Sequence, residues 1–223
     1  MKARLHSLGR MDYQAAWEIQ LRICQEVQEG APDTLILVEH PPVMTLGAAF
    51  QPANLLHPRE WYEARGIQVV PTDRGGDVTC HNPGQLVLYP IYNVANHGRD
   101  LHQWMRQLEE AMIQVCGSLG LEAGRRPPHT GCWLGDLKAA SIGVKVKRWV
   151  SIHGIALNCC NDLSLFDLIV PCGIPGRPMT SLSNALHRKV TVGEAVPLAV
   201  QAFSDVFKSE FDGPSAAAAD GFL

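Results

Sequence analysis

A cysteine held between a proline and a glycine is the residue of this 223-residue chain best suited to covalent chemistry. Cys172 follows an apolar run and stands in the sequence Pro171-Cys172-Gly173. Proline fixes its own φ, and glycine lets the backbone approach a ligand closely, so this turn would hold a thiol rigidly with one side open. We therefore predict that Cys172 is a nucleophile, with Cys80 as a weaker second candidate. The other five cysteines are expected to be inert small hydrophobic residues: Cys24, Cys116, Cys132, Cys159 and Cys160.

A thiol attacks as its thiolate, so the nucleophile needs a cation nearby. A free thiol has a pKa of about 8.5, which an adjacent positive charge lowers. The candidates for this cation are Lys138, which opens a predicted strand, and a protonated His81 or His153. A lysine at a strand end is more commonly a solvated charge, and the residues alone leave both interpretations of Lys138 open. A thiol nucleophile implies a thioester intermediate and a two-step acyl transfer.

Three short segments could wrap the acyl group: Arg74 to His81, Ser141-Ile142-Gly143 and Gly154-Ile155-Ala156. In the first, paired glycines permit a turn whose amide groups cradle an oxyanion or a carbonyl, and Arg74 could add a planar fork of donors. A plain hairpin loop is the alternative interpretation of this segment. We expect Ser141-Ile142-Gly143 to be a turn. Its small residues, and those of Gly154-Ile155-Ala156, would leave room for an acyl chain.

Several other kinds of chemistry lack support in the sequence. There is no G-x-S-x-G elbow, no P-loop pattern and no C-x-x-C zinc motif. A net charge of −3 argues against a nucleic-acid surface, and no apolar run is long enough to span a membrane. The N-terminal residues lack the apolar region of a secretory signal, and seven irregularly spaced cysteines do not form a disulfide framework. We therefore expect a cytoplasmic protein with reduced thiols, no metal and no cofactor.

The hydrophobic pattern predicts one α/β domain over residues 1–212, followed by a disordered tail over 213–223. We predict helices over 12–29, 58–65, 100–119 and 191–211, and strands over 34–39, 43–47, 67–70, 85–93, 130–133, 138–146 and 149–159. Gly135-Asp136 and Lys147-Arg148 are expected to be turns, and 125–128 a surface loop with solvated arginines.

Motifs spread from about Leu5 to about Phe211 resemble those of the octanoyltransferases of lipoate biosynthesis. Each is weak alone, but their order along the chain is specific. The matching pieces are Glu39-His40-Pro41-Pro42-Val43, Thr45-Leu46-Gly47, Arg74-Gly75-Gly76, Thr79, His81, Pro83-Gly84-Gln85, Lys138, Ile142-Gly143-Val144, His153-Gly154, Ala156-Leu157-Asn158 and Pro171-Cys172-Gly173.

The resemblance implies transfer of an octanoyl or lipoyl group from acyl carrier protein to a lysine of lipoyl domains, those of 2-oxoacid dehydrogenase complexes and the glycine cleavage H protein. It implies the fold of biotin and lipoate ligases, a mixed and largely antiparallel sheet flanked by helices (α+β). The resemblance places the thioester on Cys172. It also implies that Lys138 lowers the pKa of this thiol and later acts as the base that deprotonates the incoming amine. The acyl-binding residues that it implies are Arg74, Gly75, Gly76, Asp77, Val78, Thr79, Cys80, His81, Ser141, Ile142, Gly143, Gly154, Ile155 and Ala156.

The sequence departs from the family pattern at Cys80, where an aromatic residue is usual, at Asn82, where glycine is usual, and at Ala139, where isoleucine is frequent. The change at Cys80 could alter the acyl pocket and its chain-length preference. Three other functions compete with acyl transfer: an ATP-dependent lipoate or biotin ligase, a cysteine hydrolase pairing Cys172 with His81 or His153, and a non-catalytic protein that binds acyl carriers.

Overall fold

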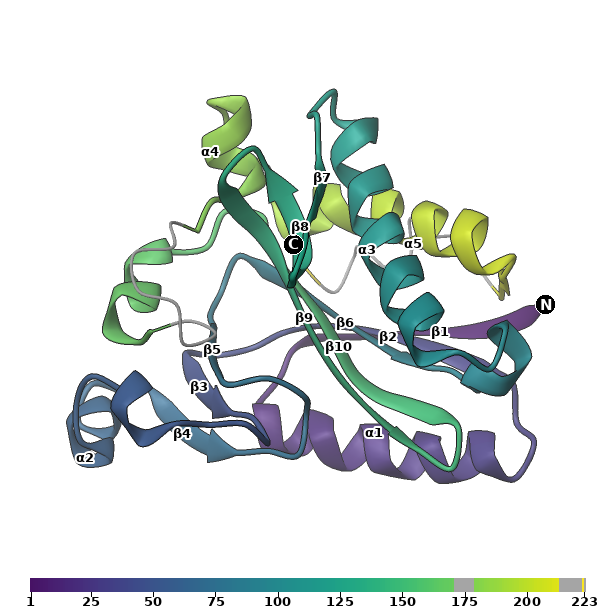
Figure 1. The fold of residues 1–223 in the computed structure, drawn as a ribbon, viewed down its shortest axis with the longest axis horizontal. Helices are drawn as coiled ribbons and strands as arrows, with labels where there is room; N and C mark the ends of the chain where they lie inside the picture. Colours follow the sequence, from purple (N-terminus) through teal and green to yellow (C-terminus); the bar gives the residue numbers. More distant parts are fainter. Residues whose placement is uncertain (171–178, 213–221, 223) are drawn as a thin grey trace.

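The fold is built on a mixed sheet of eight strands, seen edge-on in the computed structural model (Figure 1). The structure describes residues 1–170, 179–212 and 222. Across the sheet the order is β11-β1-β2-β6-β10-β9-β8-β7, and only the pairings of β1 with β11 and with β2 are parallel. The strands are β1 (Lys2–Arg10), β2 (Asp33–Glu39), β6 (Gln85–Ile91), β7 (Gly124–Arg126), β8 (His129–Leu134), β9 (Leu137–Lys147), β10 (Val150–Asn158) and β11 (Glu210–Phe211).

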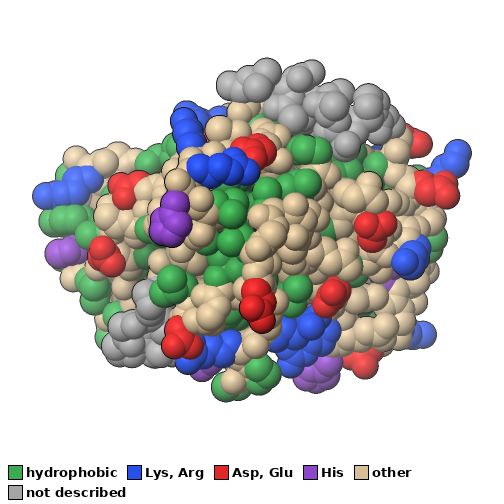
Figure 2. Space-filling model, turned by 90° about the horizontal axis from the view of Figure 1, so that it is seen from above, with side chains coloured by type: hydrophobic (Ala, Val, Ile, Leu, Met, Phe, Trp, Pro, Cys, Tyr) green, Lys and Arg blue, Asp and Glu red, His purple; other side chains and the backbone are tan. Residues whose placement is uncertain are grey.

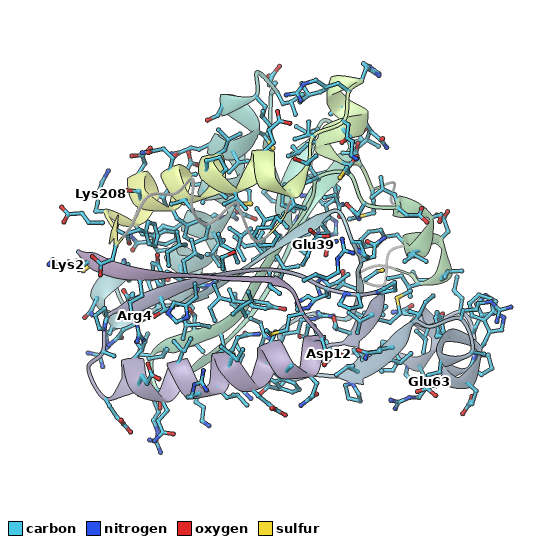
Figure 3. All side chains as sticks on the ribbon, turned by 180° about the vertical axis from the view of Figure 1, so that it is seen from behind. Lys2, Arg4, Asp12, Glu39, Glu63 and Lys208 are labelled. Atoms are coloured by element: carbon cyan, nitrogen blue, oxygen red, sulfur yellow. The ribbon has the colours of Figure 1, made fainter. Side chains whose placement is uncertain are left out.

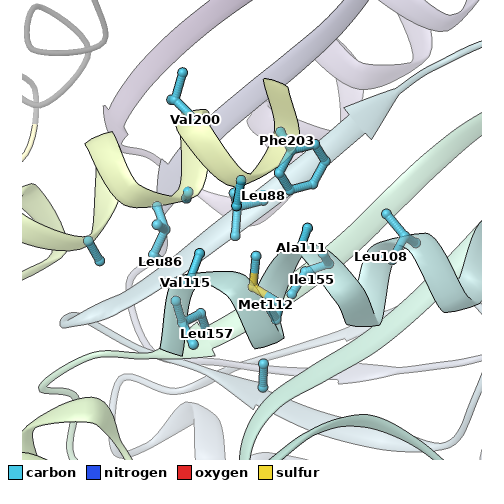
Figure 4. Close-up of a cluster of buried hydrophobic side chains, with 14 of the residues drawn as sticks. Leu86, Leu88, Leu108, Ala111, Met112, Val115, Ile155, Leu157, Val200 and Phe203 are labelled. Carbon is cyan, nitrogen blue, oxygen red and sulfur yellow. The ribbon is translucent and has the colours of Figure 1, made fainter. Parts of the chain in front are cut away.

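Helices cover both faces of this sheet, because its central strands are apolar on both sides. Side chains alternate between faces along a strand, so in β2 Leu35 and Leu37 point to one core while Ile36 and Val38 point to the other. The first core lies under α3 (Leu101–Ser118) and α5 (Val192–Phe207), and Figure 4 shows their side chains meeting those of β6 and β10. The second core lies under α1 (Tyr13–Gln28) on the opposite face.

Polar contacts fix α1 at its start and along its length (Figure 3). The Asp12 carboxylate caps the helix by accepting from the amides of Gln14 and Ala15. From β1, Arg4 reaches down to Glu26 of the helix with a 2.9 Å ion pair. The sequence prediction of a helix capped by Asp12 is confirmed.

A second, smaller sheet packs beside the end of the large one and carries part of the cavity wall. Its order is β4-β3-β5, with β3 (Val43–Leu46), β4 (Gln68–Pro71) and β5 (Val78–His81). It shares a third core with α2 (Arg59–Glu63) and the 3₁₀ helix η3 (Leu163–Leu168). The remaining short helices are η1 (Pro52–Asn54), η2 (Val94–His97) and α4 (Leu182–Leu186).

The predicted elements are confirmed in type, but several boundaries and connections are wrong. The segment Lys2–Arg10, for which no strand was predicted, forms β1, and Val78–His81, predicted as a loop, forms β5. Part of the loop predicted over 125–128 pairs with β8 as β7. The last helix ends at Phe207, because Lys208 has a left-handed backbone (φ 53°).

Two turn predictions also need correction. Ser141-Ile142-Gly143 is not a turn but lies inside β9, paired with β10. The turn after β9 is formed by Arg148 and Trp149, which have positive φ values of 50° and 66°, one residue later than predicted. The turn at Gly135-Asp136 is confirmed.

Of the tail predicted to be disordered, residues 213–221 and 223 lie outside the described residues, and Phe222 packs against the first core. No helix in the described ranges combines the length and apolar character needed to cross a membrane.

Candidate active site

The predicted acyl-binding segments meet around one cavity of about 350 Å³, within the range of small-molecule sites. It is walled by the loop after β4, by β5, β9 and β10, and by Met105 of α3. The predicted residues that line it are Arg74, Gly75, Gly76, Asp77, Val78, Thr79, His81, Lys138, Ser141, Ile142, Gly143, Gly154, Ile155 and Ala156.

Among the described residues, Cys80 is the predicted acyl-binding residue that does not line this cavity. The side chain of Cys80 is fully buried in the third core, behind the cavity wall, because alternate residues of β5 point to opposite sides. Burial raises the pKa of this thiol far above its ordinary value, so Cys80 is unsuited to act as a nucleophile. The predicted nucleophile Cys172 lies outside the described residues.

Arg74 organises its own loop, contrary to the prediction that its fork faces a ligand. Its Nε donates to the Thr45 hydroxyl at 3.1 Å, and Nη2 donates to the carbonyls of Thr45 and Asp77 at 2.6 and 2.7 Å. Nη1 donates to the carbonyl of Gly75 at 3.0 Å. The guanidinium thereby ties the loop to β3. The Arg74 side chain also forms part of the cavity wall.

Glycines in the wall allow backbone to touch backbone rather than leave room for a chain. A Cβ on Gly143 would lie 2.8 Å from the carbonyl oxygen of Gly75, and a Cβ on Gly154 would lie 2.1 Å from that of Leu88. The amide of Gly75 also donates to the Val144 carbonyl at 2.9 Å. The Arg74 loop is thus docked directly on β9, and the predicted reason for these glycines is wrong.

Lys138 is a buried residue in the cavity wall and not the solvated edge residue that its position near the start of the strand would suggest. Its exposed fraction is 7%, and its Nζ lies 5.4 Å from the centre of the Trp133 ring. Gly131 of the neighbouring strand makes room for the lysine, since a Cβ there would lie 2.5 Å from Lys138 Cε. A buried lysine beside a cavity is a candidate for a chemical role.

The residues on either side of segment 171–178, which contains Cys172 and is called the Cys172 segment below, are hydrogen-bonded to elements at or near the cavity. Before it, the Val170 amide donates to the Asn54 carbonyl at 2.8 Å. After it, Met179 lines the cavity and forms a bridge with Lys138, and the Thr180 amide donates to the Lys138 carbonyl at 3.0 Å.

Neither His81 nor His153 supplies the cation that a thiolate would need. Burial, followed by the charge of His40, lowers the pKa of His81 to about 3. Burial also lowers the pKa of His153, although its contact with Asp73 opposes the shift. Both rings are therefore neutral near pH 7. Of the three residues predicted as the cation beside the thiolate, Lys138 remains.

Several lining residues were missed by the sequence interpretation because they lie on elements assigned to the core. They are Tyr13, Val87, Tyr89, Met105, Trp133, Val144 and Met179, with Pro128 from the turn between β7 and β8 and with His129 and Thr130 from the start of β8. On the face seen in Figure 2, hydrophobic side chains gather in the centre with charged side chains around them. Among the described residues no group of three or more His, Cys, Asp or Glu side chains is placed to hold a metal ion.

The architecture is that of the lipoate and biotin ligases. Lipoate-protein ligase A bound with ATP superposes with a TM-score of 0.77 at 18% identity, covering 99% of this chain and 93% of that chain. The biotin protein ligase of Aquifex aeolicus gives a TM-score of 0.54 at 12% identity, with 93% and 70% covered. The expected mixed sheet flanked by helices is confirmed.

The chain belongs to the lipoyl protein ligase A/B catalytic domain family, whose model matches residues 12–204. It is 47% identical over 191 residues to the octanoyltransferase of Geobacter metallireducens, covering 85% of this chain and 86% of the relative. It is 46% identical over 217 residues to the octanoyltransferase of Solibacter usitatus, covering 96% and 98%.

Proposed function

We propose that this protein transfers an octanoyl group from acyl carrier protein to a lysine of lipoyl domains, with Cys172 as nucleophile and Lys138 as its activating base. The observation that supports it most is the buried Lys138, which lies in the cavity wall and pairs through its backbone with the residues that follow the Cys172 segment.

The enzyme class rests on the relatives. The protein is an acyltransferase that acts on octanoyl groups in protein lipoylation, in line with octanoyltransferases that are 43–47% identical over most of its length. Its ATP-bound structural neighbour shares the fold at 18% identity, which carries no argument about reaction type.

In the first step, the Cys172 thiolate attacks the carbonyl carbon of the carrier thioester. The new bond joins Cys172 sulfur to the acyl carbon, and the bond from that carbon to the carrier sulfur breaks. The carrier leaves as a thiol after taking a proton from the Lys138 ammonium, which becomes neutral. The ammonium of Lys138 favours the thiolate, since a nearby positive charge stabilises the charged form. Apolar lining residues such as Val87, Met105 and Ile155 are suited to hold the acyl chain.

In the second step, the lysine amine of the lipoyl domain attacks the acyl carbon. An amide bond forms, the carbon–sulfur bond breaks, and the proton lost by nitrogen compensates the one gained by sulfur. Lys138 in its neutral form is the base for the incoming amine. The reaction as written needs neither a metal nor a cofactor.

The protein partners that we propose are octanoyl-acyl carrier protein and the lipoyl domains of 2-oxoacid dehydrogenase complexes and the H protein. Because a carrier protein is acidic, basic residues would dock it, and the candidates in the sequence are Arg74, Lys145, Lys147 and Arg148. Arg74 is 7% exposed and is excluded from a surface role. Lys145 is half-exposed but paired with Asp73 at 2.8 Å. Lys147 and Arg148 are exposed at the end of the β9–β10 hairpin and remain candidates.

The test is an intact-mass measurement after incubation with octanoyl-acyl carrier protein, with and without hydroxylamine. We expect one octanoyl adduct that hydroxylamine removes and that Cys172→Ala abolishes. Cys160→Ala is the control, since this half-exposed thiol lies outside the cavity lining. An unlabelled wild type, or full transfer by Cys172→Ala, would show the nucleophile to be wrong.

Two further measurements address the competing functions and the base. Transfer that requires ATP would favour a ligase, and release of free octanoate without an amine acceptor would favour a hydrolase. Lys138→Ala should raise the pKa for alkylation of Cys172 by iodoacetamide. An unchanged alkylation profile would remove Lys138 from the activating role.

A further inference from the structure

Three buried histidines surround Tyr13 beside the cavity, and two of them use both ring nitrogens within the protein. His40 Nδ1 donates to the carbonyl of Met11 at 2.8 Å, so its Nε2 accepts from the Tyr89 hydroxyl, also at 2.8 Å. His153 Nε2 donates to Asp73 at 2.7 Å, and its Nδ1 lies 3.4 Å from the Tyr13 hydroxyl. Each ring therefore has an assigned tautomer, because one partner in each case can only accept.

His81 differs, because among the described residues only its Nδ1 has a hydrogen-bond partner. Nδ1 lies 2.7 Å from Gln85 Oε1. The orientation of the Gln85 amide is fixed from its other end, where Nε2 donates to the carbonyl of Cys80 at 3.2 Å and to Asn158 Oδ1 at 2.9 Å. Since a backbone carbonyl can only accept, the atom facing His81 is the Gln85 oxygen, and His81 Nδ1 carries a proton.

Asn158 confirms this orientation one step further along. Its Nδ2 donates to the carbonyl of Thr180 at 2.9 Å, which leaves Oδ1 as the acceptor for Gln85. The carbonyls of Cys80 and Thr180 thus fix the orientation of the Gln85 and Asn158 amides, and Gln85 in turn contacts His81. Because the ring is neutral near pH 7, its Nε2 holds a lone pair. Within the described ranges of the chain, that nitrogen has no hydrogen-bond partner, and His81 lines the cavity.

Because His81 Nε2 has a lone pair, it can bind only those reacting groups that donate a hydrogen bond. It cannot stabilise a carbonyl oxygen or an oxyanion, which need donors. The acyl chain and its carbonyl have no N–H or O–H to offer. The incoming lysine nitrogen does, and it must present its own lone pair to the acyl carbon while its hydrogens point elsewhere.

We propose that Nε2 of His81 accepts a hydrogen bond from the attacking lysine amine, and that Gln85 and Asn158 are positioning residues that hold His81 in this tautomer. This inference rests on the proposed function and assigns a residue to its second step. The nitrogen–carbon bond forms and the carbon–sulfur bond breaks while His81 orients the N–H. His81 keeps no proton, and the one that leaves nitrogen passes to Lys138 and balances the proton taken up by sulfur.

The tautomer is measured directly on the unmodified enzyme by ¹⁵N NMR with labelled histidine. The His81 signals are identified as those missing from the His81→Phe spectrum. We expect a protonated Nδ1 and an unprotonated Nε2 at pH 7, and a Nδ1–H signal that Gln85→Leu weakens or splits between tautomers. A protonated Nε2 in the wild type, or an imidazolium at pH 7, would overturn the proposal.

The role in the second step is tested by separating the two steps in single turnovers. Acylation is followed by mass after mixing with octanoyl-acyl carrier protein, and deacylation by mixing the isolated octanoyl-enzyme with a lipoyl domain. For His81→Phe we expect deacylation to slow by about 10- to 100-fold, as for loss of one strong hydrogen bond, with acylation within about twofold. Gln85→Leu, which removes the acceptor for Nδ1, should slow deacylation less than His81→Phe does.

His40→Asn is the matched control, because His40 is an equally buried neighbouring histidine that does not line the cavity. We expect the ratio of its two rates to stay at the wild-type value. Equal slowing of both steps by His81→Phe would assign Nε2 to the thiol instead and refute the proposal. If the wild type takes no octanoyl label at all, the proposed function fails, while the NMR result still decides the tautomer.

Discussion

The amide of Thr180 donates a 3.0 Å hydrogen bond to the carbonyl of Lys138, so the chain that follows the Cys172 segment joins the strand that carries the buried lysine. On the preceding side, the carbonyl of Asn54 accepts from Val170. The Asn54 side chain also donates to Asp77 of the Arg74 loop, which we propose binds the acyl group. One asparagine therefore links the loop to the residues just before the proposed nucleophile.

The first prediction concerns the contact between the Asn54 amide and the Asp77 carboxylate. Asn54→Asp should reduce octanoyl transfer by about tenfold, because two carboxylates would face each other where one hydrogen bond to a charged group now stands. Asp77→Asn alone should weaken the loop, since Asp77 also accepts from the amides of Gln51 and Val78. Steady-state transfer rates and the alkylation rate of Cys172 are the measurements.

The double variant Asn54→Asp, Asp77→Asn restores one carboxylate and one amide at this contact. It should recover activity well above that of Asn54→Asp. A double variant that is no better than the product of its single variants would show that the contact does not couple the two positions.

The close approach of the Arg74 loop to β9 gives the second prediction. Gly143→Ala should lower the free energy of unfolding by about 1–3 kcal/mol, because its Cβ would lie 2.8 Å from the Gly75 carbonyl oxygen. Gly117→Ala is the matched control, since nothing lies within 4 Å of a Cβ in this helical position. It should stabilise by about 0.5–1 kcal/mol. Urea denaturation separates the two, and equal stability of Gly143→Ala and wild type would contradict the docking contact.

Chain-length preference is the subject of the third prediction. Cys80→Ala should lower stability by about 1–2 kcal/mol and leave the ratio of octanoyl to hexanoyl transfer unchanged, because Cys80 lies in the third core and outside the cavity lining. Ala156→Leu fills cavity space and should lower that ratio by about 15-fold, if two methylenes worth about 0.8 kcal/mol each lose their burial. Competition between the two acyl donors measures both. A changed ratio in Cys80→Ala would show that this residue reaches the acyl chain.

Acid sensitivity of the fold is the fourth prediction. Burial lowers the pKa of His40 to about 4 and that of His81 to about 3, whereas both titrate near 6.5 in the unfolded chain. Between these values the unfolded state binds more protons, so stability falls as the pH decreases from about 6.5 towards 4. Two such groups give a slope of up to about 2.7 kcal/mol per pH unit.

Urea denaturation between pH 7 and pH 4.5 measures this slope, and His40→Asn should lower it by up to about 1.4 kcal/mol per pH unit. A stability that stays flat between pH 6.5 and pH 4.5 would show that the two rings are not held neutral by burial.

The sequence predicted the cavity wall far better than it predicted the roles of individual residues in it. Motif order located the three wall segments, because glycines and a histidine at fixed spacing are visible in a linear chain. Whether a side chain faces the cavity depends on strand alternation, so Cys80 and His81 could not be distinguished until β5 was known. The donors of Arg74 serve carbonyls of its own loop and of β3, which no local pattern reveals.

The elements that were missed are those created by their partners. β7 is Gly-Arg-Arg and has no apolar alternation of its own, and it exists because β8 offers an edge. Arg125 in that strand pairs with the buried Glu109 and with Glu110 of α3 rather than being solvated. In contrast, α1, α3 and the central strands were predictable because their apolar periodicity is strong and local.

The pairing of β1 with β11 joins the start of the chain to residues 210–211. Figure 3 shows Lys2 and Lys208 at the same end of the molecule, and the N-terminal ammonium of Met1 donates to the Lys208 carbonyl at 2.5 Å. During synthesis on the ribosome, β1 emerges before the other described strands and β11 after them. The outer edge of β1 therefore stays unpaired until residues 210–211 have been synthesised, and over that interval it is open to pairing with another strand.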